Sequence, residues 1–196
     1  MAEPGATKVE PATAAEVTKA LLEKIKQQIR REQYKQALVT GEKAIENGQI
    51  SAELLQLLAM ASFLDDNESM SVGYIDQTLR LTEAIEFPLL FETSGKKHIG
   101  GTLAISRTMI SFTSDGQNSA PGKILLSLGL AQIKSVYDDV RREALNLFKK
   151  KKNRTNPILI VKDQRNRRYS LQLLSDDPPL RKFIRHVINT VRKKQA

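Results

Sequence analysis

Residues 99–113 read Ile-Gly-Gly-Thr-Leu-Ala-Ile-Ser-Arg-Thr-Met-Ile-Ser-Phe-Thr, and this stretch decides the fold class. Residues 99–105 alternate between apolar and small or polar side chains, and residues 108–113 form a second β-prone run. A period of two is typical of a strand with one buried face. Ser106-Arg107 leaves room only for a tight connection, so the stretch predicts two strands joined by a short turn.

Strand-like runs continue on both sides of this pair. Five further runs share the pattern: residues 89–92, 124–128, 133–137, 157–161 and 169–173. The last two are predicted to form a hairpin around a turn at residues 163–166. Residues 138–155 are predicted to be a long charged insertion.

A final helix is expected after Asp176-Asp177-Pro178-Pro179, because aspartate and proline favour a helix N-terminus. Its apolar residues lie on one stripe: Leu180, Phe183, Ile184, Val187, Ile188 and Val191.

Before residue 88 the apolar residues recur at helical spacing. Four helices are predicted, at residues 13–31, 32–46, 51–64 and 68–86, with Pro88 ending the last. The first would begin with a capping box, Thr13-Ala-Ala-Glu16. Residues 1–12 show no apolar period and are expected to form a mobile tail.

The helical part contains a weak internal repeat. Residues 34–46 align with residues 74–86 at an offset of 40, beginning with Tyr34 and Tyr74 and ending in Ala-Ile-Glu. The stretch Tyr34-Lys-Gln-Ala-Leu…Gly41-Glu-Lys-Ala-Ile resembles the second helix of a tetratricopeptide repeat. The resemblance implies TPR-like helical hairpins that bind protein, with Tyr34 and Tyr74 as candidate contact residues.

The second part resembles the pleckstrin-homology (PH) superfold, and most of all its GRAM-type branch. The resemblance rests on residues 101–112, then Ile124-Leu-Leu, Ile133-Lys-Ser-Val, the last hairpin and the closing helix, and covers about residues 89–194. It implies an antiparallel β-sandwich or barrel closed by a C-terminal helix. The expected fold class is therefore α+β, with a tail (1–12), a TPR-like helical unit (13–87) and a PH/GRAM-like domain (88–196).

Charge divides unequally between the two parts. Residues 1–86 carry 9 Lys+Arg and 14 Asp+Glu, whereas residues 87–196 carry 22 and 8, so the net charges are −5 and +14 and sum to the +9 of the whole chain. The second part should therefore seek an anionic partner.

The densest cationic run is Lys-Lys-Lys-Lys-Asn-Arg at residues 149–154, which directly follows apolar Leu145, Leu147 and Phe148. Such a run can meet anionic lipid headgroups. The resemblance to the PH superfold adds the loop after its first strand, whose basic residues often bind phosphoinositides. The candidate anion- or lipid-binding residues are Lys96, Lys97, Lys149, Lys150, Lys151, Lys152, Arg154, Arg165, Arg167 and Arg168.

Three alternatives stand beside this interpretation. The lysine run can be a solvated loop that only keeps the chain soluble. The anion can be nucleic acid, in a ribonucleoprotein-associated accessory protein, although aromatic residues do not alternate with the basic ones. The acidic part can also dock on the basic part of the same chain.

Several classes of function are not indicated. The chain has no cysteine, and its two histidines, His98 and His186, are not at metal-ligand spacing. No catalytic constellation, cofactor motif, signal peptide or membrane span is visible in the sequence. We expect a non-enzymatic cytoplasmic adaptor without metal or cofactor, peripheral at a membrane, whose helical unit binds protein and whose basic part docks on phospholipid or an acidic protein.

Overall fold

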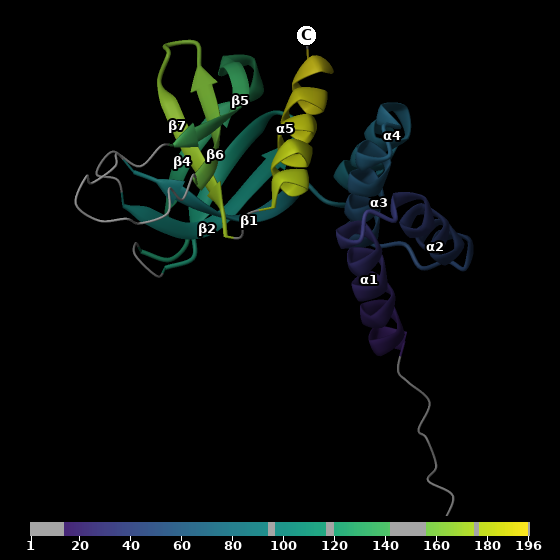
Figure 1. The fold of residues 1–196 in the computed structure, drawn as a ribbon. Helices are drawn as coiled ribbons and strands as arrows, with labels where there is room; N and C mark the ends of the chain where they lie inside the picture. Colours follow the sequence, from purple (N-terminus) through teal and green to yellow (C-terminus); the bar gives the residue numbers. More distant parts are fainter. Residues whose placement is uncertain (1–13, 94–96, 117–119, 142–155, 175–176, 196) are drawn as a thin grey trace, which may run out of the picture.

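The computed structural model describes residues 14–93, 97–116, 120–141, 156–174 and 177–195. Within these residues, helices come first, a run of strands follows, and a last helix closes the chain (Figure 1). The elements are α1 (Ala14–Arg30), α2 (Tyr34–Glu46), α3 (Ala52–Leu64), α4 (Glu68–Leu81), β1 (Ala84–Glu92), β2 (His98–Ser106), β3 (Met109–Ser114), β4 (Ile124–Gly129), the short 3-10 helix η1 (Leu130–Gln132), β5 (Ile133–Arg141), β6 (Asn156–Asp163), β7 (Arg168–Leu173) and α5 (Pro178–Lys193).

Helix α3 is the centre of the helical unit formed by α1–α4. It contacts α1, α2, α4 and also α5, and the residues that it buries include Leu54, Leu55 and Leu58. Gly41 of α2 lies so close to Leu58 that a β-carbon at this position would collide with the leucine. The absence of a side chain on residue 41 therefore lets α2 pack closely against α3.

Two side-chain caps set where α3 and α4 begin. The hydroxyl oxygen of Ser51 accepts a hydrogen bond from the Leu54 N–H at 3.1 Å, and the Asn67 amide oxygen accepts one from the Met70 N–H at 3.2 Å. Each cap satisfies a backbone donor that the first helical turn leaves unpaired. The predicted capping box at Thr13 lies outside the described residues.

The fourth helix ends at Leu81, not at residue 86 as predicted. Thr82 takes an extended conformation, and its hydroxyl donates to the Ala84 carbonyl at 3.0 Å. From Ala84 onward buried and exposed residues alternate, which is the period of a strand, and Pro88 lies inside β1 on an exposed position. The second copy of the proposed repeat is therefore part helix and part strand.

The strands form one antiparallel sheet in the order β4-β3-β2-β1-β7-β6-β5. Two meanders, β1–β4 and β5–β7, are joined where the end of β1 pairs with β7, with Glu92 opposite Ser170. The predicted strands and the predicted final hairpin are therefore confirmed in type and order. The first four residues of the predicted insertion, 138–141, belong to β5, and residues 142–155 lie outside the described part.

Of the two predicted forms, sandwich or barrel, a closed barrel is not observed, because no pairing joins β4 to β5 among the described residues. Helix α5 contacts β5 in this part of the fold. The guanidinium of Arg192 donates to the carbonyl oxygens of Ile133 at 3.3 Å and Lys134 at 3.2 Å. These bonds connect the end of α5 to the beginning of β5.

Helix α5 lies between the sheet and the helical unit (Figure 1). Phe183 is 1% exposed, and its ring contacts Phe87 of β1 and Phe63 of α3, each with a centroid distance of 6.2 Å. Buried side chains of the helical unit, the sheet and α5 form one continuous hydrophobic cluster. The helical and β-rich parts therefore share a core instead of being joined by a free linker.

Candidate functional site: two cationic surfaces

Positive charge gathers on α5. Residues 178–194 contain six Lys or Arg and no Asp or Glu. Asp177, which directly precedes the helix in the sequence, is its N-cap and accepts a hydrogen bond from the Leu180 N–H at 2.9 Å. An anion is stabilising at this end of the helix, so Asp177 stabilises the first turn of α5.

One side of α5 is held to β5 by arginines. A terminal guanidinium nitrogen of Arg185 lies 2.9 Å from one oxygen of Asp138, and Nε of Arg181 lies 3.3 Å from the other. Together with Arg192 on the β5 carbonyls, these contacts fix the orientation of α5 on the sheet. The arginines on this side are therefore engaged within the fold.

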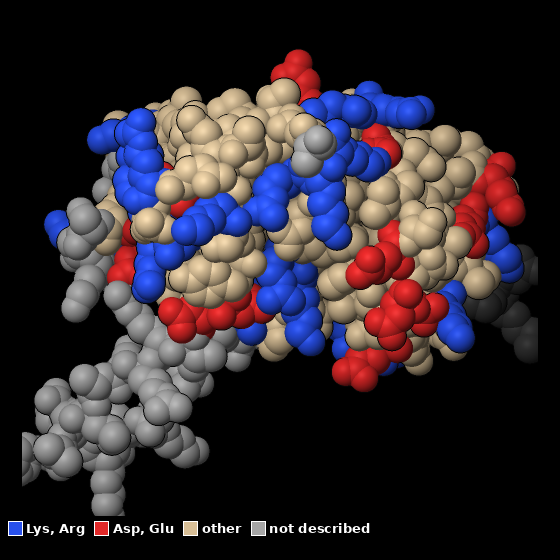
Figure 2. Space-filling model, turned by 90° about the horizontal axis from the view of Figure 1, so that it is seen from above, with Lys and Arg blue, Asp and Glu red and all other residues tan. Residues whose placement is uncertain are grey.

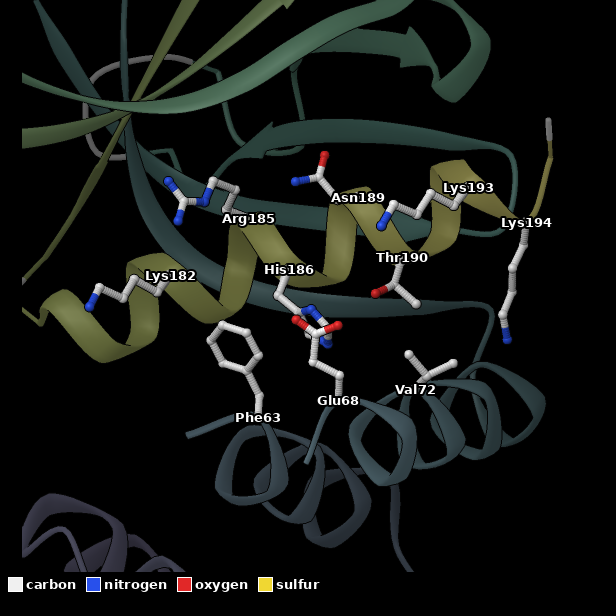
Figure 3. Close-up of a pocket in the computed structure, with 10 residues that line it drawn as sticks. All are labelled: Phe63, Glu68, Val72, Lys182, Arg185, His186, Asn189, Thr190, Lys193 and Lys194. Carbon is white, nitrogen blue, oxygen red and sulfur yellow. The ribbon is translucent and has the colours of Figure 1, made fainter. Parts of the chain in front are cut away.

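The other side of α5 lines a groove of about 410 Å³ against α3 and α4. Phe63, Glu68 and Val72 form the wall from the helical unit. Of the α5 side chains, His186 and Thr190 point toward this wall, whereas Arg185 and Asn189 point away from it (Figure 3). The α5 wall is polar and includes Lys182, His186, Asn189, Thr190 and Lys193. Both parts of the chain thus contribute to the groove.

His186 joins the two walls. Its ring stacks on that of Phe63 with a centroid distance of 4.4 Å, and Nε2 lies 3.1 Å from the hydroxyl oxygen of Ser71. Ser71 donates its own proton to the Ala59 carbonyl at 2.8 Å, so Nε2–H of His186 is the donor in the bond to Ser71. Burial lowers the pKa of His186 below its usual value, nearby Lys193 lowers it further, and Glu68 opposes both. The ring is therefore neutral at pH 7.

The serine and histidine do not form a nucleophile and its base. Ser71 is 0% exposed, and its proton points to Ala59 instead of to the imidazole. A nucleophile must reach its substrate and pass its proton to the base. The part of the chain that the structure describes also holds no group of three or more His, Asp or Glu residues placed to bind a metal ion.

The cations of the groove differ in their partners. Arg185 is paired with Asp138 and Lys194 with Asp76. Lys182 and Lys193 have no carboxylate partner among the described residues. Glu68 is the single acid of the groove wall, so positive charge exceeds negative charge there.

A second set of cations surrounds the β6–β7 turn. This set, the hairpin cluster, consists of Lys134, Lys162, Arg165, Arg167 and Arg168. Figure 2 shows Lys and Arg gathered over the β-rich part and Asp and Glu prominent over the helical part. Lys162 and Arg168 are direct cross-strand partners, an arrangement of like charges that costs stability unless an anion offsets it.

One member of the hairpin cluster has a structural partner. Nε of Arg167 lies 2.6 Å from Asp163, and the Arg167 backbone N–H donates to the same carboxylate at 2.8 Å. Burial alone would raise the pKa of Asp163, but the hydrogen bonds from Arg167 hold this pKa below its usual value. Arg167 therefore closes the turn, whereas Arg165 and Arg168 are exposed with no acid bound to them among the described residues.

The predicted anion-binding residues are placed only in part. Lys97 is exposed at the start of β2. Glu92 of β1 pairs with His98 of β2 on one side and with Ser170 of β7 on the other. Lys97 and Arg168 therefore lie at the ends of adjacent hairpins. The other predicted residues lie outside the described part: Lys96, Lys149, Lys150, Lys151, Lys152 and Arg154.

The two tyrosines predicted to contact a protein point into the fold. Tyr74 is buried, and its hydroxyl donates to Glu42 at 3.2 Å. Burial, followed by the charge of Glu42, raises the pKa of Tyr74 to about 12. Tyr34 is partly buried against the core, and burial raises its pKa as well. Both rings therefore stabilise the helical packing.

The groove was missed in the sequence. Lys182, His186, Asn189 and Lys193 recur at helical spacing opposite the apolar stripe of α5, which was a signal for a polar face. Nothing local indicated that α3 and α4 would form the opposite wall, because that contact joins residues more than 100 positions apart.

Comparison with known proteins does not assign this chain to a family. No family model matches the chain, and no curated protein sequence matches it. A solved C-terminal domain of an unknown protein from Leishmania infantum is 16% identical, with a TM-score of 0.36 over 59% of this chain and 96% of that one. A complex of human RhoA with the DH/PH fragment of PDZRhoGEF is 11% identical, with a TM-score of 0.38 over 94% and 70%. A structure of Vav1 with an allosteric inhibitor is 9% identical, with a TM-score of 0.37 over 92% and 63%.

These TM-scores are below 0.5, so the likenesses identify neither a family nor a function for this chain. Among the described residues, no helix has the length and apolar character to cross a membrane.

Proposed function

We propose that this chain is a non-enzymatic adaptor in which a PH-like, GRAM-type module docks on an anionic phospholipid surface and the TPR-like helical unit engages a protein. The hairpin cluster is the contact with the lipid.

The observation that carries the proposal is the charge of the hairpin cluster. Residues 162–168 hold four Lys or Arg and one acid, Asp163, which is buried and paired with Arg167. Because Lys162 faces Arg168 across the strands, the fold maintains a repulsion at this site. Binding of anionic headgroups would relieve that repulsion.

The expected strength of docking follows from the number of available cations. Each Lys or Arg close to an acidic bilayer contributes about 1 kcal/mol. Lys134, Lys162, Arg165 and Arg168 together would contribute about 4 kcal/mol, which is suited to reversible attachment. Lys97, at the adjacent hairpin end, extends the same surface.

The test is sedimentation with vesicles of phosphatidylcholine, with and without phosphatidylserine. We expect binding only to the anionic vesicles, and we expect Arg165→Ala/Arg168→Ala to weaken it about 30-fold, since two cations are lost. Lys35→Ala/Lys43→Ala removes two exposed lysines of α2 and serves as the control for net charge. The run at residues 149–152 is replaced by alanine in a separate variant.

Two results would overturn the proposal. One is equal loss of vesicle binding in the α2 control, because binding would then follow net charge alone. The other is absence of vesicle binding together with a salt-sensitive gel shift of RNA or DNA, which would favour the nucleic-acid alternative.

A further inference from the structure

We propose that the groove between α5 and the α3–α4 side of the helical unit binds an extended acidic segment of a partner polypeptide. This inference rests on the protein-binding part of the proposed function and is independent of vesicle binding.

The spacing of two lysines on the polar face of α5 sets the length of peptide that the groove can bind. Lys182 and Lys193 are 11 positions apart, close to three full helical turns, so both lie on the same face. Their separation along the helix axis is about 16 Å. An extended chain rises about 3.3 Å per residue, so about five residues span the two ammonium groups.

The charges of the groove favour an acidic ligand. Lys182 and Lys193 have no acid partner among the described residues, whereas Arg185 and Lys194 are already paired with Asp138 and Asp76. A ligand with carboxylates at both ends of an extended stretch would pair with the two available lysines.

The opposite wall favours a peptide over the other anions. Phe63 and Val72 supply apolar surface inside a concave groove, which the flat face of a bilayer does not enter (Figure 3). The Glu68 carboxylate repels a continuous row of phosphates but accepts hydrogen bonds from peptide N–H groups. The Phe63 ring already stacks on His186, so it is not available as a platform for a nucleic-acid base.

The experiment uses the full chain, ¹⁵N-labelled, and a capped hexapeptide with Glu at both ends and small apolar residues between. Amide shifts are followed by NMR during titration. The matched probe carries Gln at both ends. We expect the Glu peptide to shift the amides of α5 around Lys182, His186 and Lys193, and the Gln peptide to leave them unchanged.

Variants separate this site from the lipid surface. Lys182→Gln/Lys193→Gln should weaken binding of the Glu peptide about tenfold, as expected for two exposed ion pairs. Lys35→Gln/Lys43→Gln should leave it unchanged. Arg165→Ala/Arg168→Ala should weaken vesicle binding about 30-fold and leave peptide binding unchanged, so the two proposals can fail independently.

Four outcomes would overturn the inference. The Glu and Gln peptides could shift the same amides equally. The Glu peptide could shift the hairpin cluster and not the groove, or shift nothing at millimolar concentration. Anionic vesicles could perturb the groove amides more strongly than the peptide does, which would make the groove a lipid site.

Discussion

Nε2 of His186 lies 3.1 Å from the hydroxyl oxygen of Ser71, although the two residues are 115 positions apart in the chain. This contact, with the stacking of His186 on Phe63, ties the C-terminal helix to the helical unit. It is made by a neutral imidazole in a groove that also contains Lys182, Arg185, Lys193, Lys194 and Glu68.

The first prediction concerns pH. Because the fold lowers the pKa of His186, the unfolded chain binds a proton more readily than the folded one. The free energy of unfolding should therefore fall as the pH drops through about 6.5, the usual histidine value, and level off below the folded pKa. Urea unfolding at several pH values measures this loss.

The control for this prediction is a pair of histidine variants. His186→Phe should remove most of the loss between about pH 7 and 5.5 that wild type shows. His98→Gln, at an exposed position on β2, should retain it. If both variants behave like wild type, another group is responsible.

The second prediction concerns the shared core. Phe183→Ala should lower the free energy of unfolding by about 3–5 kcal/mol, because it removes a ring packed between α3 and β1. Helix and strand signals should still be lost in one transition. Leu81→Ala, at a side chain that is 56% exposed, should change little. Two separated transitions in wild type would contradict a common core.

The third prediction compares two glycines. A β-carbon on Gly101 would collide with the backbone carbonyl of Thr113 on the neighbouring strand, which cannot move aside without breaking the sheet. Gly101→Ala should therefore be strongly destabilising. Gly73 of α4 has open space around it, so Gly73→Ala should stabilise by up to about 1 kcal/mol. Thermal unfolding of the two variants distinguishes these opposite signs.

The fourth prediction concerns the β6–β7 turn. Arg167→Ala should raise the pKa of the Asp163 carboxyl, because it removes the guanidinium that stabilises the ionised form. In wild type, the Arg167–Asp163 pair should stabilise the fold above about pH 4, the usual aspartate pKa. This stabilisation should be lost as the pH falls through the pKa of Asp163 in the folded state, which is lower. NMR titration of Asp163 measures the shift. Arg165→Ala should leave that titration unchanged, and an equal change in both variants would show that the pair is not specific.

The strands and the closing helix could be predicted because each is a local pattern. Alternation over residues 99–113 and the apolar stripe from Leu180 to Val191 report burial directly. Residues 84–87 could not be assigned to a strand, since Pro88 also marks the end of a helix and only pairing with β2 makes this stretch a strand.

The candidate sites were harder to predict for a similar reason. The cationic turn at residues 165–168 is visible as a run of sequence, but the engagement of Arg167 depends on the buried carboxylate of Asp163. The burial of Tyr74 could not be predicted from the sequence, because it depends on packing between helices. The groove is a product of tertiary structure and has no local signature beyond the polar face of α5.

The position of α5 has a consequence for how the chain is made. Phe183 contacts Phe63 and Phe87, which leave the ribosome about 100 residues earlier. At ~5–20 residues per second, that is a delay of about 5–20 s. During this interval the nascent helices and strands expose the apolar surfaces that α5 will later cover. Chaperones that bind such surfaces should therefore engage this protein during translation and leave it once residues 178–193 emerge.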